Sequence, residues 1–194
     1  MILAGGLSRR MGGGDKGLLQ LGDRPVLGHV IDRIRPQVSA LALNANGDPA
    51  RFAAFGLRVV PDPIPGFAGP LVGILAAFSW AEEIAPHATH VLTAPSDTPF
   101  LPPDLVARLQ AAIRAPGDSA VAGRDGRRHS VVGLWPLEHR PLLEAAVRDG
   151  LRKVEAWIDR VNTRVVSFDG GPSDPFFNVN TPSDLDAARE ILGA

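Results

Sequence analysis

The spacing of apolar and polar positions along the chain predicts strands and helices in alternation. Within residues 25–36, Val26, Val30 and Ile34 recur at helical spacing, with Pro25 suited to the first turn and Pro36 to the end. Residues 89–97, THVLTAPSD, are apolar at nearly every position until a polar turn follows. Such a run is typical of a central strand covered on both faces of a parallel sheet.

The same pattern extends over the rest of the sequence. It predicts further strands at 1–4, 38–46, 57–60, 119–123, 130–135 and 163–168, and helices at 49–55, 69–81, 102–113, 138–148, 152–160 and after Thr181. Thr181 and Pro182 suit the N-cap and first residue of the last helix, whose inner face we expect to carry Leu185, Ala188 and Leu192.

This order of elements indicates the fold class. Strands that alternate with helices imply right-handed crossovers and a mostly parallel central sheet with helices on both faces. We therefore expect an α/β protein with a three-layer α/β/α, Rossmann-like fold. Because no internal repeat or long linker interrupts the pattern, we expect one domain over residues 1–194.

Composition narrows the classes of function. Twenty Lys and Arg balance twenty-one Asp and Glu, so the broad basic surface of a nucleic-acid-binding protein is not expected. The chain has no cysteine, which excludes thiol nucleophiles and zinc–thiolate sites. Residues 69–81 form an apolar segment too short to cross a bilayer, and the first residues do not resemble a signal peptide. We expect a cytoplasmic protein without membrane or nucleic-acid partners.

The densest cluster of glycine lies in residues 2–19, ILAGGLSRRMGGGDKGLL. Backbone amides of such a loop can point at an anion, and Lys16 would add a charge on the same phosphates. Residues 12–17 match GxGxxG, but the predicted strand ends at Ala4, too early for a dinucleotide-binding turn. A Walker A loop fails because Gly17 follows Lys16. We expect a phosphate-binding loop of another type, with a plain surface loop as the alternative.

Polar residues follow several predicted strands. Asp97 comes directly after the apolar strand, where its carboxylate could bind Mg²⁺ or simply form a turn. Asparagine amides at strand ends can bind a base edge, a ribose or a pterin, although they also form turns. Because ligands bind beyond the carboxyl ends of parallel strands, we expect these residues to share one polar site. They are Asn44, Asn46, Asp62, Asp97, Asn178 and Asn180.

These motifs, taken in order, resemble one known family. The segments LAGGLSRRMGGGDKGLL, NAN, VVPD, GPLVGI, PSDTPF and NVNTP are similar to those of the molybdenum cofactor guanylyltransferases and span nearly the whole chain. The resemblance implies a nucleotidyltransferase fold and Mg²⁺-dependent transfer of GMP from GTP to molybdopterin, or its molybdenum-bearing form, with release of pyrophosphate. It also implies transient contacts with other cofactor-assembly proteins.

The resemblance further implies a role for each matching residue. Lys16, Asp97 and Arg10 would be catalytic, with Lys16 on the GTP phosphates and Asp97 binding both GTP and Mg²⁺. The guanine nucleotide would contact Leu3, Ala4, Gly5, Gly6, Asn44 and Asp62, whereas Asn178 and Asn180 would lie near the pterin.

Two other functions remain open on the sequence. A cytidylyltransferase acting on the same pterin or on a small alcohol phosphate is the nearest alternative. The LAGG motif resembles the guanine-selective form, whereas cytidine-selective relatives tend to have LAAG. The second alternative is a non-catalytic GTP- and pterin-binding assembly protein, which Asp97 argues against because a metal ligand indicates an enzyme.

Overall fold

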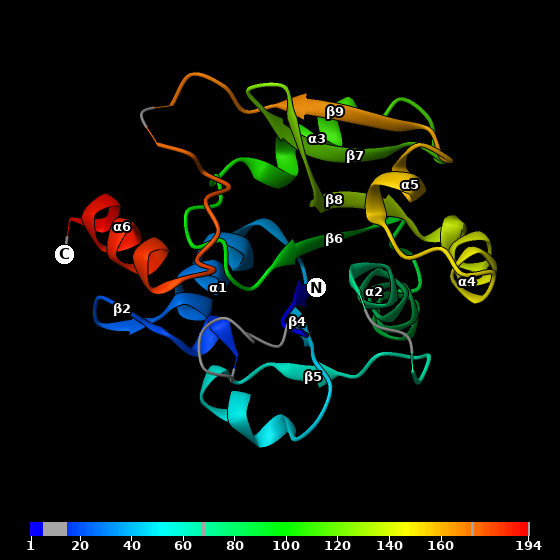
Figure 1. Cartoon of the computed structure of the whole chain (residues 1–194). Coiled ribbons are helices and arrows are strands. Elements are labelled where there is room, and N and C mark those ends of the chain that lie inside the picture. Colours follow the sequence, from blue (N-terminus) through cyan, green and yellow to red (C-terminus); the bar gives the residue numbers. More distant parts are fainter. Residues whose placement is uncertain (6–14, 67–68, 172, 194) are drawn as a thin grey trace.

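The computed structural model describes residues 1–5, 15–66, 69–171 and 173–193, and in these ranges a seven-stranded sheet forms the centre of the molecule (Figure 1). Across the sheet the strand order is β5-β4-β1-β6-β8-β7-β9, and β8 runs antiparallel to its neighbours whereas the other neighbouring pairs are parallel. The strands are β1 (Ile2–Leu3), β4 (Ala42–Asn44), β5 (Arg58–Val60), β6 (His90–Pro95), β7 (Ser119–Arg124), β8 (Arg127–Pro136) and β9 (Thr163–Ser167).

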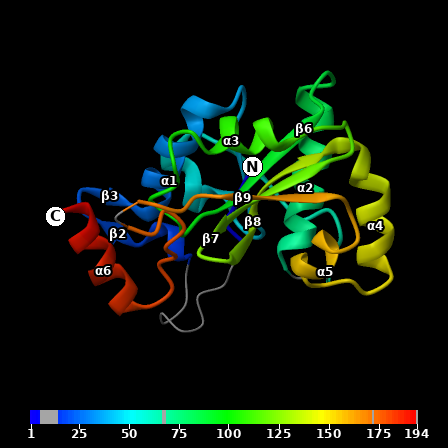
Figure 2. The same cartoon turned by 90° about the horizontal axis from the view of Figure 1, so that it is seen from above.

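Helices cover both faces of the sheet, as predicted. Figures 1 and 2 show α2 (Pro70–Ile84), α4 (Arg140–Arg148) and α5 (Val154–Ile158) on one side. They share one apolar cluster, while α1 (Val26–Ile34) and α3 (Leu105–Ala112) belong to the other. Within β6, Val91 joins the first cluster and Leu92 the second, because successive strand residues point to opposite faces. The expected three-layer, mostly parallel α/β architecture is confirmed.

The short elements differ from the prediction more than the central strands and long helices do. Residues 49–55 form a 3₁₀ helix (Pro49–Phe55) that ends at Gly56 in the left-handed region, with φ 61°. A small hairpin of β2 (Gln20–Leu21) and β3 (Arg24–Pro25) precedes α1 and was not predicted. Further 3₁₀ turns are η2 (Lys16–Leu18), η3 (Arg35–Gln37) and η5 (Leu137–His139).

The last helix, α6 (Pro182–Leu192), packs beside the β2–β3 hairpin (Figure 2). Thr181 is its N-cap and forms a reciprocal capping box with Asp184. Ala188 is fully buried, but Leu192 is 40% exposed, so its expected place in the core was wrong. The helix packs on a small apolar cluster that includes Leu21, and its final turn lies beyond this cluster.

The register of the parallel strands places the site. Leu3 pairs with Asn44 on one side and with Pro95 on the other, and Asn44 pairs in turn with Val60. The chain therefore leaves β1, β4, β5 and β6 at one edge of the sheet, as predicted. Residues that follow these four strands are neighbours in space although they are far apart in sequence.

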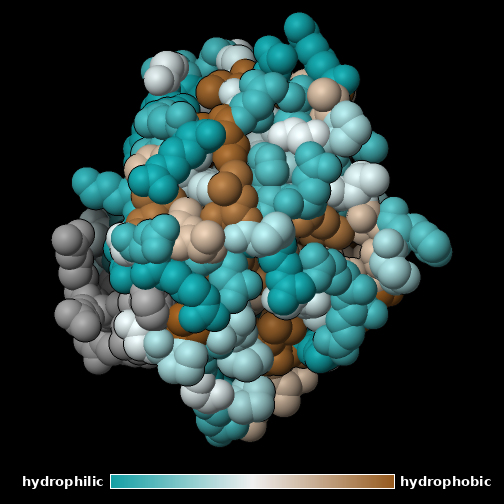
Figure 3. Space-filling view, turned by 90° about the vertical axis from the view of Figure 1, so that its right-hand side faces the viewer, coloured by the Kyte–Doolittle hydropathy of each residue, from teal (hydrophilic) through white to brown (hydrophobic). Residues whose placement is uncertain are grey.

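The outer surface is mainly polar on the side of α4. Figure 3 shows mostly hydrophilic side chains there, with apolar ones exposed in separate tracts. Leu142 on α4 is 54% exposed. Within the described ranges, no helix has both the length and the apolar character needed to cross a membrane.

Candidate active site

A cavity of about 270 Å³ opens at the edge where β1, β4, β5 and β6 end. The start of α2 closes one side of it through Gly69 and Pro70, and Val131 of β8 contributes on another. The cavity brings together seven of the residues predicted from sequence, which are Leu3, Gly5, Lys16, Asn44, Asn46, Asp62 and Asp97.

The other predicted site residues are placed differently. Ala4 is buried, 4% exposed, and its amide donates to the Asn44 carbonyl, so it supports the edge and does not line the cavity. Asn178 and Asn180 contact cavity residues from a later segment of the chain. Gly6 and Arg10, with most of the glycine-rich loop, lie outside the described residues.

One end of the cavity is formed by a carboxylate held between two amides. The side-chain amide of Asn44 donates to Asp62 Oδ1 at 2.9 Å, and that of Asn46 donates to Asp62 Oδ2 at 2.7 Å. In return, the Asp62 backbone amide donates to Asn46 Oδ1 at 2.9 Å. Asn44 is 3% exposed and also donates to the Val60 carbonyl, so the group is firmly oriented. Such a fixed set of donors and acceptors suits the recognition of a polar ligand.

Close approach of α2 secures this end of the site. A β-carbon on Gly73 would lie 2.7 Å from Asn44 Oδ1, a distance that real side chains do not adopt. Gly73 therefore allows the helix to pack directly over the Asn44 amide. The sequence showed a glycine here, but nothing in the pattern revealed the contact that requires it.

The other end of the cavity carries opposite charges. Lys16 Nζ lies 3.8 Å from Asp97 Oδ2, and their side chains are 23% and 16% exposed. Lys16 also donates to Asn180 Oδ1. The Asn178 amide donates to Asp97 Oδ1 and to Thr98 Oγ1, each at 2.9 Å. The cation and the carboxylate are thus oriented by neutral amides, and both face the cavity.

Gly17 brings Lys16 to this position and was not identified from sequence as a site residue. It is buried in the η2 turn, where a β-carbon would lie 3.2 Å from both the Ser96 carbonyl oxygen and Leu27 Cβ. The absence of a side chain lets the turn rest against the end of β6. The lysine therefore reaches Asp97, which follows Ser96.

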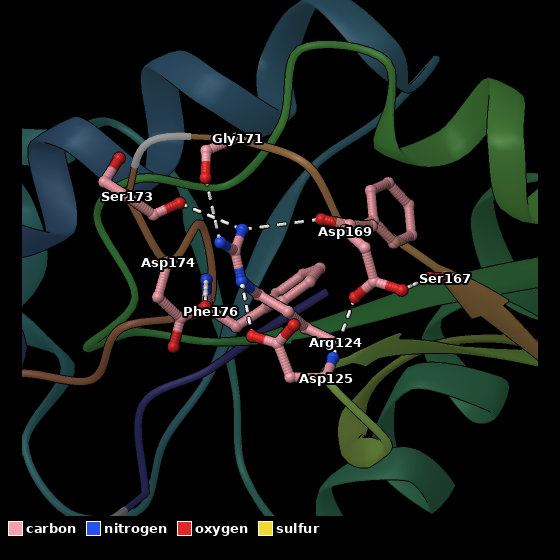
Figure 4. A network of polar contacts seen from close by, with 9 residues as sticks. Arg124, Asp125, Ser167, Asp169, Gly171, Ser173, Asp174 and Phe176 are labelled. Carbon is pink, nitrogen blue, oxygen red and sulfur yellow. Dashed lines mark hydrogen bonds and ion pairs between the residues drawn. The ribbon is translucent and has the colours of Figure 1, made fainter.

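Asn178 and Asn180 belong to a connection that we call the strap, residues 168–171 and 173–181, which leads from β9 to α6 (orange in Figure 1). Arg124, at the end of β7, fastens its first part (Figure 4). The guanidinium of Arg124 donates to the carbonyls of Gly171 and Ser173, each at 3.0 Å. The Asp125 backbone amide adds a bond to Asp169.

The middle of the strap is held by aromatic packing. Phe176 is 1% exposed, with its ring centroid 4.4 Å from that of His129 and 5.3 Å from that of Phe168. Burial lowers the pKa of His129, whereas the charge of Asp174 partly opposes this shift. Beyond Phe176, the Val179 amide donates to the Asp97 carbonyl at 2.9 Å, which joins the strap to the site.

A metal ion at this site would depend on Asp97. Among the described residues, no group of three or more His, Cys, Asp or Glu side chains is arranged to enclose a metal. Asp97 presents its carboxylate to the cavity with one oxygen bonded to Asn178. One carboxylate with substrate phosphates and water is a normal ligand set for Mg²⁺. The residues present therefore fit magnesium better than a metal that needs a complete protein cage.

Comparisons with known proteins show the family to which the chain belongs. Residues 1–164 match the family described as MobA-like NTP transferase domain. The chain is 50% identical to a molybdenum cofactor guanylyltransferase of Rhodopseudomonas palustris strain BisB5 over 193 residues, covering 98% of this chain and 92% of the relative. It is 51% identical to one of Bradyrhizobium sp. strain ORS 278, covering 98% and 91%.

Solved structures share the fold. The molybdopterin-guanine dinucleotide biosynthesis protein A of Archaeoglobus fulgidus superposes with a TM-score of 0.74 at 23% identity, over 99% of this chain and 97% of that one. A nucleotidyl transferase from Methanothermobacter gives a TM-score of 0.73 at 18% identity, over 98% and 94%. From the sequence match to its relatives and from its fold, this chain belongs to the molybdenum cofactor guanylyltransferase family of MobA-like NTP transferases.

Proposed function

We propose that this protein transfers GMP from GTP to molybdopterin, with release of pyrophosphate. The observation that carries the proposal is the cavity itself, which sets Asn44 and Asp62 at one end and Lys16 and Asp97 at the other. The first pair suits a nucleoside, and the second suits its phosphates. Identity of about half to guanylyltransferases over nearly the whole chain supports the choice of nucleotide and acceptor.

The reaction joins two anions, so charge and alignment are the main obstacles. An oxygen of the pterin phosphate attacks the α-phosphorus of GTP, and the bond from that phosphorus to the oxygen bridging to the β-phosphorus breaks. Pyrophosphate leaves with the electron pair. A phosphate nucleophile is largely ionised near neutral pH, so the attack needs no general base. Catalysis then rests on positioning and on stabilising negative charge.

The described residues supply both the positioning of the substrates and the stabilisation of negative charge. Lys16 Nζ would lie against the phosphates of GTP, where its positive charge offsets the charge that develops on pyrophosphate. The bond that Lys16 makes to Asn180 holds the ammonium in place before the nucleotide arrives. Asn44 and Asp62 would fix the nucleoside, and Leu3 and Gly5 form the wall between the two ends.

Asp97 would hold Mg²⁺, which when bound neutralises phosphate oxygens and aligns them for displacement. Asn178 orients this carboxylate through its bond to Oδ1. Because Asn178 and Asn180 lie beside Asp97 and Lys16, we place the pterin phosphate next to these two amides. Arg10 and Gly6, outside the described residues, keep their proposed roles at the phosphates and the nucleotide.

One assay separates the candidate functions. Purified protein is incubated with molybdopterin, Mg²⁺ and each of the four nucleoside triphosphates in turn, and pyrophosphate is measured. We expect release with GTP and much less with CTP. Preference for CTP would instead establish a cytidylyltransferase. Binding of GTP without pyrophosphate release would establish a non-catalytic assembly protein.

The cellular setting is also part of the proposal. We place the reaction in the cytoplasm, as expected from the sequence, and we expect the transient contacts with other cofactor-assembly proteins that the family resemblance implies. Co-purification of the tagged protein from cytosolic extract, with and without a crosslinker, would test both expectations. Recovery of the protein in another fraction would contradict the location.

A further inference from the structure

Arg51, on the 3₁₀ helix after β4, lies just outside the cavity and joins two parts of the site. Its Nε donates to Asp15 Oδ2 at 2.5 Å. Its two terminal nitrogens donate to backbone carbonyls, one to that of Asp48 and one to that of Asn46 at 2.7 Å. One guanidinium thus binds three acceptors from two segments far apart in sequence.

The two segments belong to opposite ends of the cavity. Asp15 directly precedes Lys16, the residue that contacts Asp97 and Asn180. Asn46 bonds in both directions to Asp62 at the proposed nucleoside end. Arg51 therefore connects the residue that precedes Lys16, at the proposed phosphate-binding end, to the residue that holds Asp62, at the proposed nucleoside-binding end.

The surroundings of Arg51 favour a fixed side chain. The side chains of Arg51 and Asp15 are 28% and 14% exposed, so their ion pair is less screened by salt than a surface pair. Cζ of Arg51 lies 4.5 Å from the ring centroid of Phe52, which is itself buried. The planar guanidinium of arginine, with several N–H donors in a fixed geometry, suits this arrangement. A lysine ammonium could not reach all three acceptors.

We infer that Arg51 and Asp15 are positioning residues for nucleotidyl transfer, which hold Lys16 at the correct distance from the nucleoside-binding group. This inference rests on the proposed function. Neither residue touches the reacting atoms. They act through Lys16 and Asn46, so their loss misaligns the two ends of the bound nucleotide while both ends keep their own chemistry.

The test compares Arg51→Met, Arg51→Lys, Asp15→Asn and the double variant Asp15→Asn with Arg51→Met. Arg58→Met is the matched control, because Arg58 pairs with Glu83 on the exposed outer surface. Pyrophosphate release gives kcat and KM for GTP, calorimetry gives the Kd of GTP, and thermal unfolding reports the fold. A displacement of about 1 Å can lower a rate about 10²-fold, so we expect kcat/KM of Arg51→Met to fall by about that factor.

Further outcomes follow from the chemistry of the pair. Arg51→Lys keeps the charge but loses the fork, so we expect a loss of about tenfold in kcat/KM. The double variant should be no worse than the worse single variant, because both substitutions break one contact. Arg58→Met should match the wild type. If Arg51→Met does not fold, Arg51→Lys and Asp15→Asn decide the question.

The inference is overturned if Arg51→Lys and Asp15→Asn keep wild-type kcat/KM, or if thermal stability falls while kcat/KM does not. Additive losses in the double variant would also overturn it. A wild-type protein that binds GTP but releases no pyrophosphate would refute the proposed function instead. In that case the Kd of GTP tests the inference. GTP binding that is about tenfold weaker in Arg51→Met than in the wild type supports the inference, and an unchanged Kd overturns it.

Discussion

At the scale of single residues, the proposed function depends on the charge that Lys16 brings to the cavity. Replacement Lys16→Ala removes a preorganised cation, so we expect turnover to fall by about 10²-fold or more at saturating GTP. Steady-state pyrophosphate release measures the effect, with Lys16→Arg as the variant that keeps the charge. Equal turnover in Lys16→Ala and the wild type would remove Lys16 from the mechanism.

His129 makes stability depend on pH. Burial holds its pKa below the ordinary value of 6.5, with Arg124 and Arg127 lowering it further and Asp174 opposing. The folded protein therefore binds this proton less readily than the unfolded chain, and stability falls as the pH drops from 6.5 through the lower folded pKa. We expect the free energy of unfolding, measured in urea, to fall less for His129→Phe than for the wild type when the pH is lowered from 7.5 to 5. Identical pH slopes would contradict this.

The sequence predicted those site residues whose position follows from strand direction. Asn44 ends a strand, and Asp62 and Asp97 each follow one, so all three lie at the edge formed by the carboxyl ends of the parallel strands. Gly17 and Arg51 could not be found in this way. Gly17 is needed because the Ser96 carbonyl lies close to it, and Arg51 is a candidate because Asp15 lies within bonding distance of it. Both contacts join segments far apart in sequence, so they can be seen only in the folded chain.

At the scale of elements, the strap connects the far half of the sheet to the site. Arg124→Met removes three bonds to strap carbonyls, those of Phe168, Gly171 and Ser173, so we expect local opening of the strap to become easier by about 1–3 kcal/mol. Hydrogen exchange at the Val179 amide reports this opening, because that amide bonds to Asp97. Arg128→Met is the control, since Arg128 pairs with Asp159 away from the strap. Equal exchange in both variants would argue against fastening by Arg124.

Long elements with a clear period were predicted well, and short ones were not. The apolar spacing in α1 and the nearly uniform apolar runs in α2 and β6 reflect burial, which the sequence records directly. The β2–β3 hairpin has two residues in each strand, too few to show a period. The strap has no regular structure, so its path depends on Arg124 and Phe176, whose partners lie in other parts of the chain.

At the scale of the whole molecule, the two apolar clusters that cover opposite faces of the sheet share its strands, which predicts a single cooperative unit. Trp80, Trp135 and Trp157 all lie in the cluster with α2, whereas Leu105 lies in the cluster on the opposite face. Leu105→Ala should lower the free energy of unfolding by about 2–5 kcal/mol. In one domain, tryptophan fluorescence and circular dichroism would report the same shifted transition. If Leu105→Ala left the fluorescence transition unchanged, the chain would unfold as two separate units and not as one.

The strap also has a consequence for synthesis of the protein on the ribosome. Asn178 and Asn180 follow all the described strands in chain order, yet they complete the environment of Asp97 and Lys16, which emerge much earlier. A nascent polypeptide that stops short of them leaves the Lys16–Asp97 ion pair without the amides that orient it. The complete environment of this ion pair can therefore form only after the ribosome has translated the strap.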